Sequence, residues 1–191
     1  MSEIITSLEK YKWEIEGVVT KINIQDEQLL IDLENEIKNN FNENLNYVTN
    51  VKGKMTHWDY FKKNNYFKKL LKALYISFHE EGYWLPYFNK RKNRFETVIT
   101  NAWGNCLTKD DKVLRHHHLG ADFASVLYFD DYAPLCTDAG EFKTKRGLIL
   151  TLPSYMFHWV NPIDKDITRY TLAWNWSFNK EWDNLNQPEV L

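Results

Sequence analysis

The sequence predicts an α+β chain in which helices come first and a β-sandwich or barrel follows. Before Gly82, apolar residues recur at steps of three and four, as on the buried face of a helix. After Gly82, short segments alternate apolar and polar residues, and turns rich in Asp, Pro and Gly separate them. The aromatic content of 16% agrees with this division, because aromatic residues favour strands and fill β-rich cores.

The elements can be placed by these patterns. One or two strands are expected in residues 11–24, and amphipathic helices are expected over residues 26–41 and 66–80. Asp26 is the candidate N-cap of the first helix, and Asn64 or Asn65 that of the second. The strands expected after the helices are Phe95–Trp103, Leu114–His118, Phe123–Phe129, Gly147–Leu152, Tyr155–Val160 and Thr168–Phe178.

The 191 residues contain no linker or internal repeat, so we expect a single domain over residues 1–191. Residues 1–82 are expected to form an N-terminal support of helices and strands. Residues 95–178 are expected to form the β-rich core that carries any chemistry.

Charge and composition argue against several classes of protein. The net charge of −2 is unlike that of a nucleic-acid-binding surface, and the basic residues at 90–94 suit a solvated loop. Cys106 and Cys136 lie in no CxxC pattern, which indicates free thiols in a reducing compartment. No signal-peptide pattern and no membrane-spanning run occurs. We therefore expect a cytoplasmic protein. The Asn- and Lys-rich composition suggests that it is encoded by an AT-rich genome, such as that of a phage, in which case the protein would act in the cytoplasm of the host.

Three consecutive histidines precede Leu119-Gly120, and another follows 40 residues after the third. In a strand, His116 and His118 would share one face, while His117 would point the other way. Imidazole is a common ligand of iron, zinc, copper and nickel, so this pair and His158 are candidate metal ligands. The alternative is an exposed histidine run plus one core histidine.

The last expected strand has one polar face and one large apolar face. Arg169, Thr171, Ala173 and Asn175 alternate with Tyr170, Leu172, Trp174 and Trp176. If the aromatic face packs on a helix or a second sheet, the polar face lines the interior beside His158. A buried arginine needs an anionic partner, and its planar fork suits a carboxylate. The pattern therefore predicts a carboxylate-binding site next to the metal site.

With these residues in place, the segment 97–178 resembles the Fe(II)- and 2-oxoglutarate-dependent oxygenases, especially small bacterial and phage members. In that family a histidine and a second ligand two residues later begin the iron site. A distal histidine completes it, and an arginine some ten residues on binds the distal carboxylate of 2-oxoglutarate. His116-x-His118, His158 and Arg169 have this order and spacing. The resemblance implies a double-stranded β-helix, a jelly-roll or cupin-like core, with the N-terminal helices packed on one sheet.

The resemblance also implies cofactors and an activity. Fe(II) would be bound by the three histidines, and dioxygen would oxidise a substrate while 2-oxoglutarate is decarboxylated to succinate. Hydroxylation is the usual outcome. The residues implied in 2-oxoglutarate binding are Arg169, Tyr128, Thr171 and Asn175, the last being also a candidate substrate contact or a satisfied buried amide. Trp103 and Asn105 are further candidates to line the pocket, with core packing as the alternative role of the tryptophan.

One position departs from the family pattern, because the second ligand is usually Asp or Glu and here is His118. Either all three histidines bind the metal, or His118 only supports the ligands and the carboxylate of Asp122 or Asp131 is the second ligand. The first option is preferred. His117 is expected to be structural.

Two other functions compete with the oxygenase. The first is a cupin-type metalloenzyme that does not use 2-oxoglutarate, but this function would assign no role to Arg169 and Thr171. A non-enzymatic β-domain of a phage or assembly protein would bind neither metal nor 2-oxoglutarate. The substrate stays open among a protein side chain, a nucleobase and a small molecule, and the segments 83–94 and 130–146 are the expected specificity loops.

Overall fold

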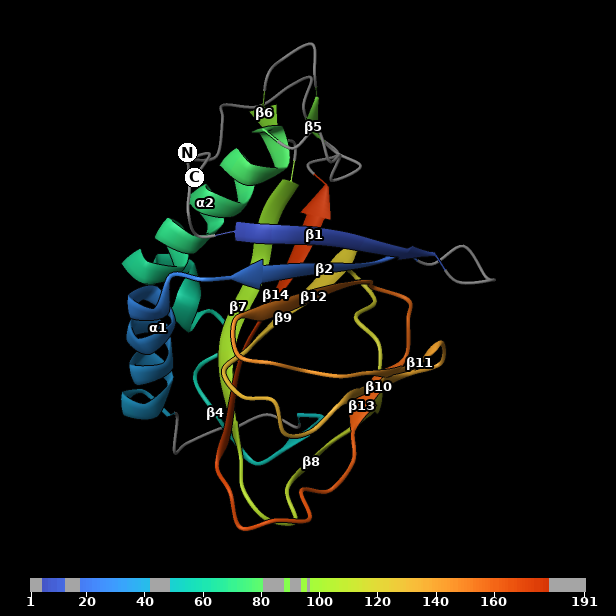
Figure 1. The fold of residues 1–191 in the computed structure, drawn as a ribbon. Helices are drawn as coiled ribbons and strands as arrows, with labels where there is room; N and C mark the ends of the chain where they lie inside the picture. Colours follow the sequence, from blue (N-terminus) through green and yellow to red (C-terminus); the bar gives the residue numbers. More distant parts are fainter. Residues whose placement is uncertain are drawn as a thin grey trace.

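Two facing β-sheets form the core of the computed structural model, which describes residues 5–12, 18–41, 49–80, 88–89, 94–95 and 97–178 (Figure 1). All strand pairs described are antiparallel. The larger sheet has the order β1 (Ile5–Lys12), β2 (Val18–Ile24), β12 (Leu148–Pro153), β9 (Phe123–Tyr128), β14 (Arg169–Phe178), β7 (Thr97–Leu107) and β4 (Lys54–Met55).

The smaller sheet has the order β11 (Gly140–Phe142), β10 (Leu135–Thr137), β13 (His158–Val160), β8 (Lys112–His116) and β3 (Val51–Lys52). A separate pair joins β5 (Phe88–Asn89) to β6 (Arg94–Phe95). Gly53 links β3 to β4 where the chain passes from the smaller sheet to the larger. A Cβ there would lie 2.6 Å from the Cys106 carbonyl oxygen, so the crossing requires glycine.

Both α-helices form where the apolar periodicity predicts them. Helix α1 (Glu27–Asn39) begins at Asp26, whose carboxylate accepts a hydrogen bond from the Leu29 amide at 2.9 Å. Helix α2 (Asn65–Glu80) begins after Asn64, whose side-chain oxygen accepts from the Phe67 amide at 3.0 Å. A 3₁₀ turn, η1 (Tyr60–Lys63), precedes α2. None of the helices that the structure describes is long and apolar enough to cross a membrane.

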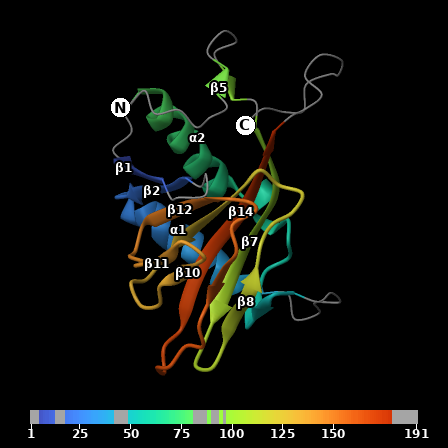
Figure 2. The ribbon, with the colours of Figure 1, turned by 90° about the vertical axis from the view of Figure 1, so that its right-hand side faces the viewer.

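The helices cover the outer face of the larger sheet, as Figure 2 shows from the side. Their buried leucines pack against the even-numbered residues of β14, among which Trp174 is fully buried. The odd-numbered residues of β14 therefore face the smaller sheet, and Ala173 packs there with Trp103 and Leu150. This arrangement confirms the expected α+β fold, with a jelly-roll core and helices on one sheet.

Several boundaries differ from the sequence prediction. Strand β8 ends at His116 rather than His118, and β13 begins only at His158, because Ser154 and Tyr155 form a turn. The segment 130–146, expected to be a loop, contributes the β10–β11 hairpin to the smaller sheet. Most of the other expected loop, 83–94, lies outside the described residues.

Candidate active site

Two of the predicted metal ligands are cross-strand neighbours in the smaller sheet. His158 on β13 pairs directly with His116 on β8, and their ring centroids lie 4.4 Å apart. Directly opposed residues in an antiparallel pair project from the same face. The register between these strands therefore brings together two histidines that are 42 positions apart.

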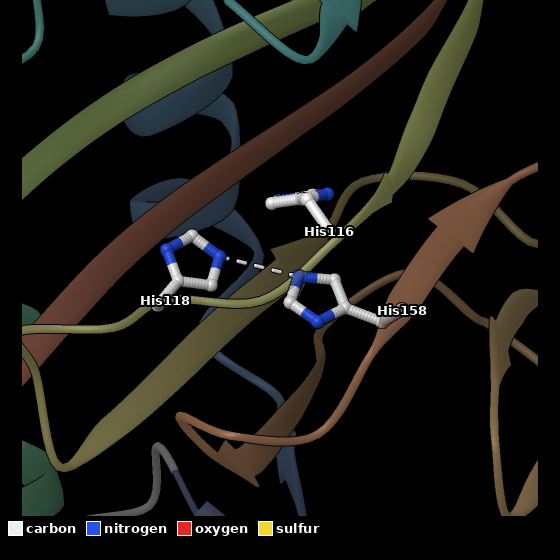
Figure 3. Close-up of side chains that lie close together, drawn as sticks. All are labelled: His116, His118 and His158. Carbon is white, nitrogen blue, oxygen red and sulfur yellow. Dashed lines mark hydrogen bonds between the residues drawn. The ribbon is translucent and has the colours of Figure 1, made fainter.

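The third histidine lies just beyond the end of β8. The His118 amide donates a hydrogen bond to the Ser154 carbonyl at 2.8 Å, which fixes the chain after the strand. The His118 and His158 Nε2 atoms are 3.2 Å apart (Figure 3). Two ligands at right angles around a metal would be about 3 Å apart for metal–nitrogen distances of ~2.1 Å, so the observed separation fits two ligands of one ion.

The rings of His116 and His158 are oriented by the same backbone device. His116 Nδ1 lies 2.7 Å from the Leu114 carbonyl oxygen, and His158 Nδ1 lies 3.0 Å from that of Met156. A carbonyl can only accept, so each Nδ1 carries the proton and each Nε2 keeps its lone pair. Backbone carbonyls commonly orient metal-binding histidines in this way.

Burial keeps the three imidazoles neutral. Loss of solvation, reinforced by the neighbouring histidines, lowers the pKa of His118 to about 3 and that of His158 to about 4. Burial also lowers the pKa of His116. Potential ligand atoms of all three residues lie within 4.8 Å of one another. At neutral pH the cluster therefore offers three unprotonated nitrogens to a metal.

Among the described residues, no carboxylate joins this cluster. Asp131 is exposed, while the backbone of Asp122 pairs with Trp176 and Ser154. The geometry thus favours His118 over either aspartate as the partner of His116. The His117 ring lies 4.5 Å from that of Phe157, outside the cluster, as the alternation of side chains predicts.

The histidine cluster and Arg169 line the same inner cavity, of about 60 Å³. They approach it from opposite sheets, since His158 belongs to the smaller sheet and Arg169 to the larger. His158 lies on β13, the strand that precedes β14 in the chain, and the two strands line this cavity from opposite sheets. Arg169 is only 1% exposed, and its guanidinium lies over the Tyr128 ring at 5.2 Å.

The other residues predicted to bind the co-substrate line two different spaces, the inner cavity and an outer cleft. Tyr128 and Thr171 line the inner cavity, and Asn105 donates to the Thr171 hydroxyl at 3.0 Å. The buried Tyr128 hydroxyl has no hydrogen-bond partner among the described residues. Burial raises the pKa of this phenol, so it remains a donor. Asn175 instead lines an outer cleft of about 350 Å³, which also reaches His116 and His118.

The outer cleft opens the histidine cluster toward the surface. Trp103 lines both the inner cavity and the outer cleft, as predicted for a pocket residue, and contacts Trp58 edge-on with ring centroids 4.1 Å apart. The residues that the structure describes along this cleft include no Asp, Glu, Lys or Arg. The cleft thus presents aromatic, amide and hydroxyl groups next to the candidate metal site.

Sequence reasoning missed one residue of the inner site, Asp130. Its Oδ1 lies 3.4 Å from Arg169 Nε, and Arg169 also donates to the Ala133 carbonyl at 2.8 Å. Burial raises the pKa of Asp130, while the charge of Arg169 opposes that rise. A signal is present in the sequence, because Asp130 follows Tyr128 by two residues at the end of an interior strand, but the composition of the segment 130–146 predicts a loop there.

Comparison with known proteins identifies the fold. No family model matches the sequence, and no curated protein is similar to it. Among solved structures, HygX from Streptomyces hygroscopicus with nickel and 2-oxoglutarate bound has a TM-score of 0.60 at 10% identity, covering 85% of this chain and 83% of that one. The viral collagen prolyl hydroxylase of Paramecium bursaria Chlorella virus-1 has a TM-score of 0.59 at 10% identity, covering 83% and 94%.

A third similar structure is a prolyl hydroxylase from Trichoplax adhaerens in complex with a hypoxia inducible factor peptide. Its TM-score is 0.55 at 17% identity, and the match covers 84% of this chain and 80% of that one. The fold is thus that of the 2-oxoglutarate and Fe(II) oxygenases. Within that fold, this chain is similar to prolyl hydroxylases and to HygX, which confirms the resemblance seen in the sequence at the level of the fold.

Proposed function

We propose that this protein is an Fe(II)- and 2-oxoglutarate-dependent oxygenase that hydroxylates its substrate. One observation carries the proposal: a single cavity is lined by three neutral histidines, which lie on or just beyond strands of one sheet, and by a buried arginine on the other sheet. One small ligand can therefore contact a metal ion and the guanidinium at once. Solved structures of the same fold include complexes with 2-oxoglutarate, which supports this choice of ligand.

His116, His118 and His158 would hold the iron, since imidazole nitrogens suit Fe(II) and all three rings are unprotonated. When bound, iron and 2-oxoglutarate would supply the oxidising chemistry that converts dioxygen and substrate into hydroxylated product, succinate and carbon dioxide. The protein binds and orients these reactants and limits side reactions. The backbone carbonyls of Leu114 and Met156 keep two of the ligand nitrogens aimed at the metal.

At the other end of the cavity, Arg169 would bind the distal carboxylate of 2-oxoglutarate. The interaction is strong there because little water screens the charge. Tyr128 offers a hydroxyl that lacks a partner, and Thr171 retains its hydroxyl hydrogen while accepting from Asn105. These three groups would set the orientation of the co-substrate.

The outer cleft would admit the substrate. Its described lining contains no Asp, Glu, Lys or Arg, so it favours an uncharged target group that packs on Trp58 or Trp103 and hydrogen-bonds to amides. Asn175 lies on this side, and its buried Oδ1 has no hydrogen-bond partner within the described ranges of the chain, so we assign it to the substrate rather than to 2-oxoglutarate. Similar structures contain a peptide in one case and hygromycin B in another, so the fold itself does not select the substrate.

An anaerobic titration tests the proposal. Metal-free protein receives Fe(II) and then 2-oxoglutarate, and the visible charge-transfer band of the chelate is recorded. We expect a band only when both are present. Iron binding without this band would favour a cupin-type metalloenzyme that does not use 2-oxoglutarate, and absence of iron binding would leave a non-enzymatic β-domain. A positive result justifies screening uncharged substrates by succinate release.

A further inference from the structure

Among the described residues, Asp130 is the carboxylate that pairs with Arg169, yet the pair is incomplete. The Nε–Oδ1 distance is 3.4 Å, and neither Arg169 Nε nor Asp130 Oδ2 has a hydrogen-bond partner in the part of the chain that the structure describes, although both atoms are buried. The guanidinium is held from elsewhere, by the Ala133 carbonyl and by the Tyr128 ring. A buried ion pair with unsatisfied atoms adds little to stability, so its presence calls for another explanation.

The balance of charges in and around the cavity provides an explanation for this ion pair. Three neutral histidines add no negative charge to a bound Fe(II), whereas a carboxylate ligand would add one. Fe(II) and Arg169 together carry three positive charges, and 2-oxoglutarate carries two negative ones, so one positive charge remains. The carboxylate of Asp130 balances it. An uncompensated charge in a buried site is costly, so where this carboxylate lies affects how strongly the cavity binds anions.

We propose that Asp130 is a positioning residue that supplies, beside Arg169, the negative charge that the all-histidine cluster lacks. This inference rests on the proposed function and extends it. Asp130 contacts Nε and the Ala133 carbonyl accepts from Nη2, so the co-substrate would bind the remaining N–H groups of the guanidinium. Its charge lowers the affinity of the site for a dianion, and so allows succinate to leave.

Asp130→Asn separates charge from geometry, because the amide keeps an acceptor oxygen for Nε and loses only the charge. The matched control is Asp131→Asn, which removes the same charge from the exposed neighbouring residue. We expect Asp130→Asn to tighten 2-oxoglutarate binding about tenfold, or about 1.4 kcal/mol. Pyruvate, which lacks the second carboxylate, should gain less. Asp130→Glu, which retains the charge, should bind within about threefold of the unaltered protein.

The experiment is the anaerobic Fe(II) titration with 2-oxoglutarate or pyruvate, carried out on the unaltered protein and the three variants. Thermal unfolding of the metal-free proteins shows whether each variant folds, and Asp130→Asn should unfold at a lower temperature than Asp131→Asn, because the buried Arg169 loses its counter-charge. If folded Asp130→Asn bound 2-oxoglutarate no more tightly than the unaltered protein, or if its affinity for 2-oxoglutarate and for pyruvate rose equally, this inference would be overturned while the proposed function would stand. Absence of a 2-oxoglutarate-dependent band in the unaltered protein would overturn the proposed function and this inference with it.

Discussion

The two ends of the inner cavity are built in opposite ways. At the histidine end, the groups are neutral, and two of the three rings are held by backbone carbonyls. At the arginine end, the groups are charged or polar, and Tyr128 Oη, Arg169 Nε and Asp130 Oδ2 lack hydrogen-bond partners among the residues that the structure describes. The histidine end is thus held in position by the backbone without a ligand, whereas the arginine end has hydrogen-bond donors that are available to a ligand.

This difference suggests a division of labour. Backbone carbonyls cannot change their charge and move little, so they suit a metal site that needs fixed geometry. Side-chain charges give stronger but less constrained attraction, which suits a co-substrate that must enter and leave. If the division holds, variants at the two ends should fail in different assays.

The largest effect is expected at the histidine end. His158→Ala should abolish iron binding, because it removes the ring that lies directly opposite His116. The measurement is the iron content after anaerobic loading and gel filtration, with circular dichroism to check the fold. His117→Ala is the control, since its ring lies outside the cluster, and it should retain iron. Full iron occupancy in His158→Ala would rule out this histidine as a ligand.

At the arginine end, Arg169→Ala should retain iron and lose 2-oxoglutarate affinity by about 3 kcal/mol, more than a hundredfold. The loss includes the repulsion between the co-substrate's carboxylate and Asp130, which the guanidinium no longer offsets. The readout is the chelate band in the anaerobic titration. Arg115→Ala is the control, because that guanidinium is exposed and pairs with Asp138 at 2.8 Å. Normal 2-oxoglutarate binding by Arg169→Ala would refute its carboxylate-binding role.

The histidine end should also make the metal-free protein sensitive to acid. The pKa of these imidazoles is 6.5 in the unfolded chain, but folding lowers it to about 4 for His158 and about 3 for His118. Between these values the unfolded chain binds more protons, so the free energy of unfolding falls as the pH drops below 6.5. Each histidine contributes up to about 1.4 kcal/mol per pH unit.

Urea unfolding of the metal-free protein from pH 7.5 to pH 4 would measure this dependence. A folded His118→Gln variant should show a shallower decrease than the unaltered protein. If the two proteins lost stability in parallel, His118 would not be the source of the acid sensitivity.

The smallest effect is expected for Tyr128→Phe. Loss of one hydrogen bond to a carboxylate should weaken 2-oxoglutarate binding about tenfold, or about 1.5 kcal/mol. The metal-free protein should be as stable as before or more stable, because the deleted hydroxyl is buried without a partner. Tyr132→Phe, which removes a hydroxyl bonded to Asp164 instead, is the control. Lower stability with unchanged affinity would show that the Tyr128 hydroxyl serves the fold and not the ligand.

Local patterns in the sequence were sufficient for the elements and for the chemistry of single faces. The apolar stripes predicted both α-helices, and Asp26 and Asn64 act as the predicted caps. Alternation along residues 169–176 correctly predicted the buried aromatic face and the polar face. These features depend on neighbouring residues, whose spacing the backbone geometry of a helix or strand determines.

Only the tertiary structure decided which distant residues meet. His118 faces His158 because the chain beyond β8 is held by Ser154, not because of strand alternation. The pairing of β8 with β13 sets His116 opposite His158, and the segment after β9 brings Asp130 to Arg169. The sequence by itself determined which residue types and faces were available. Strand register and loop packing, which depend on contacts across the whole chain, decided how those residues form one site.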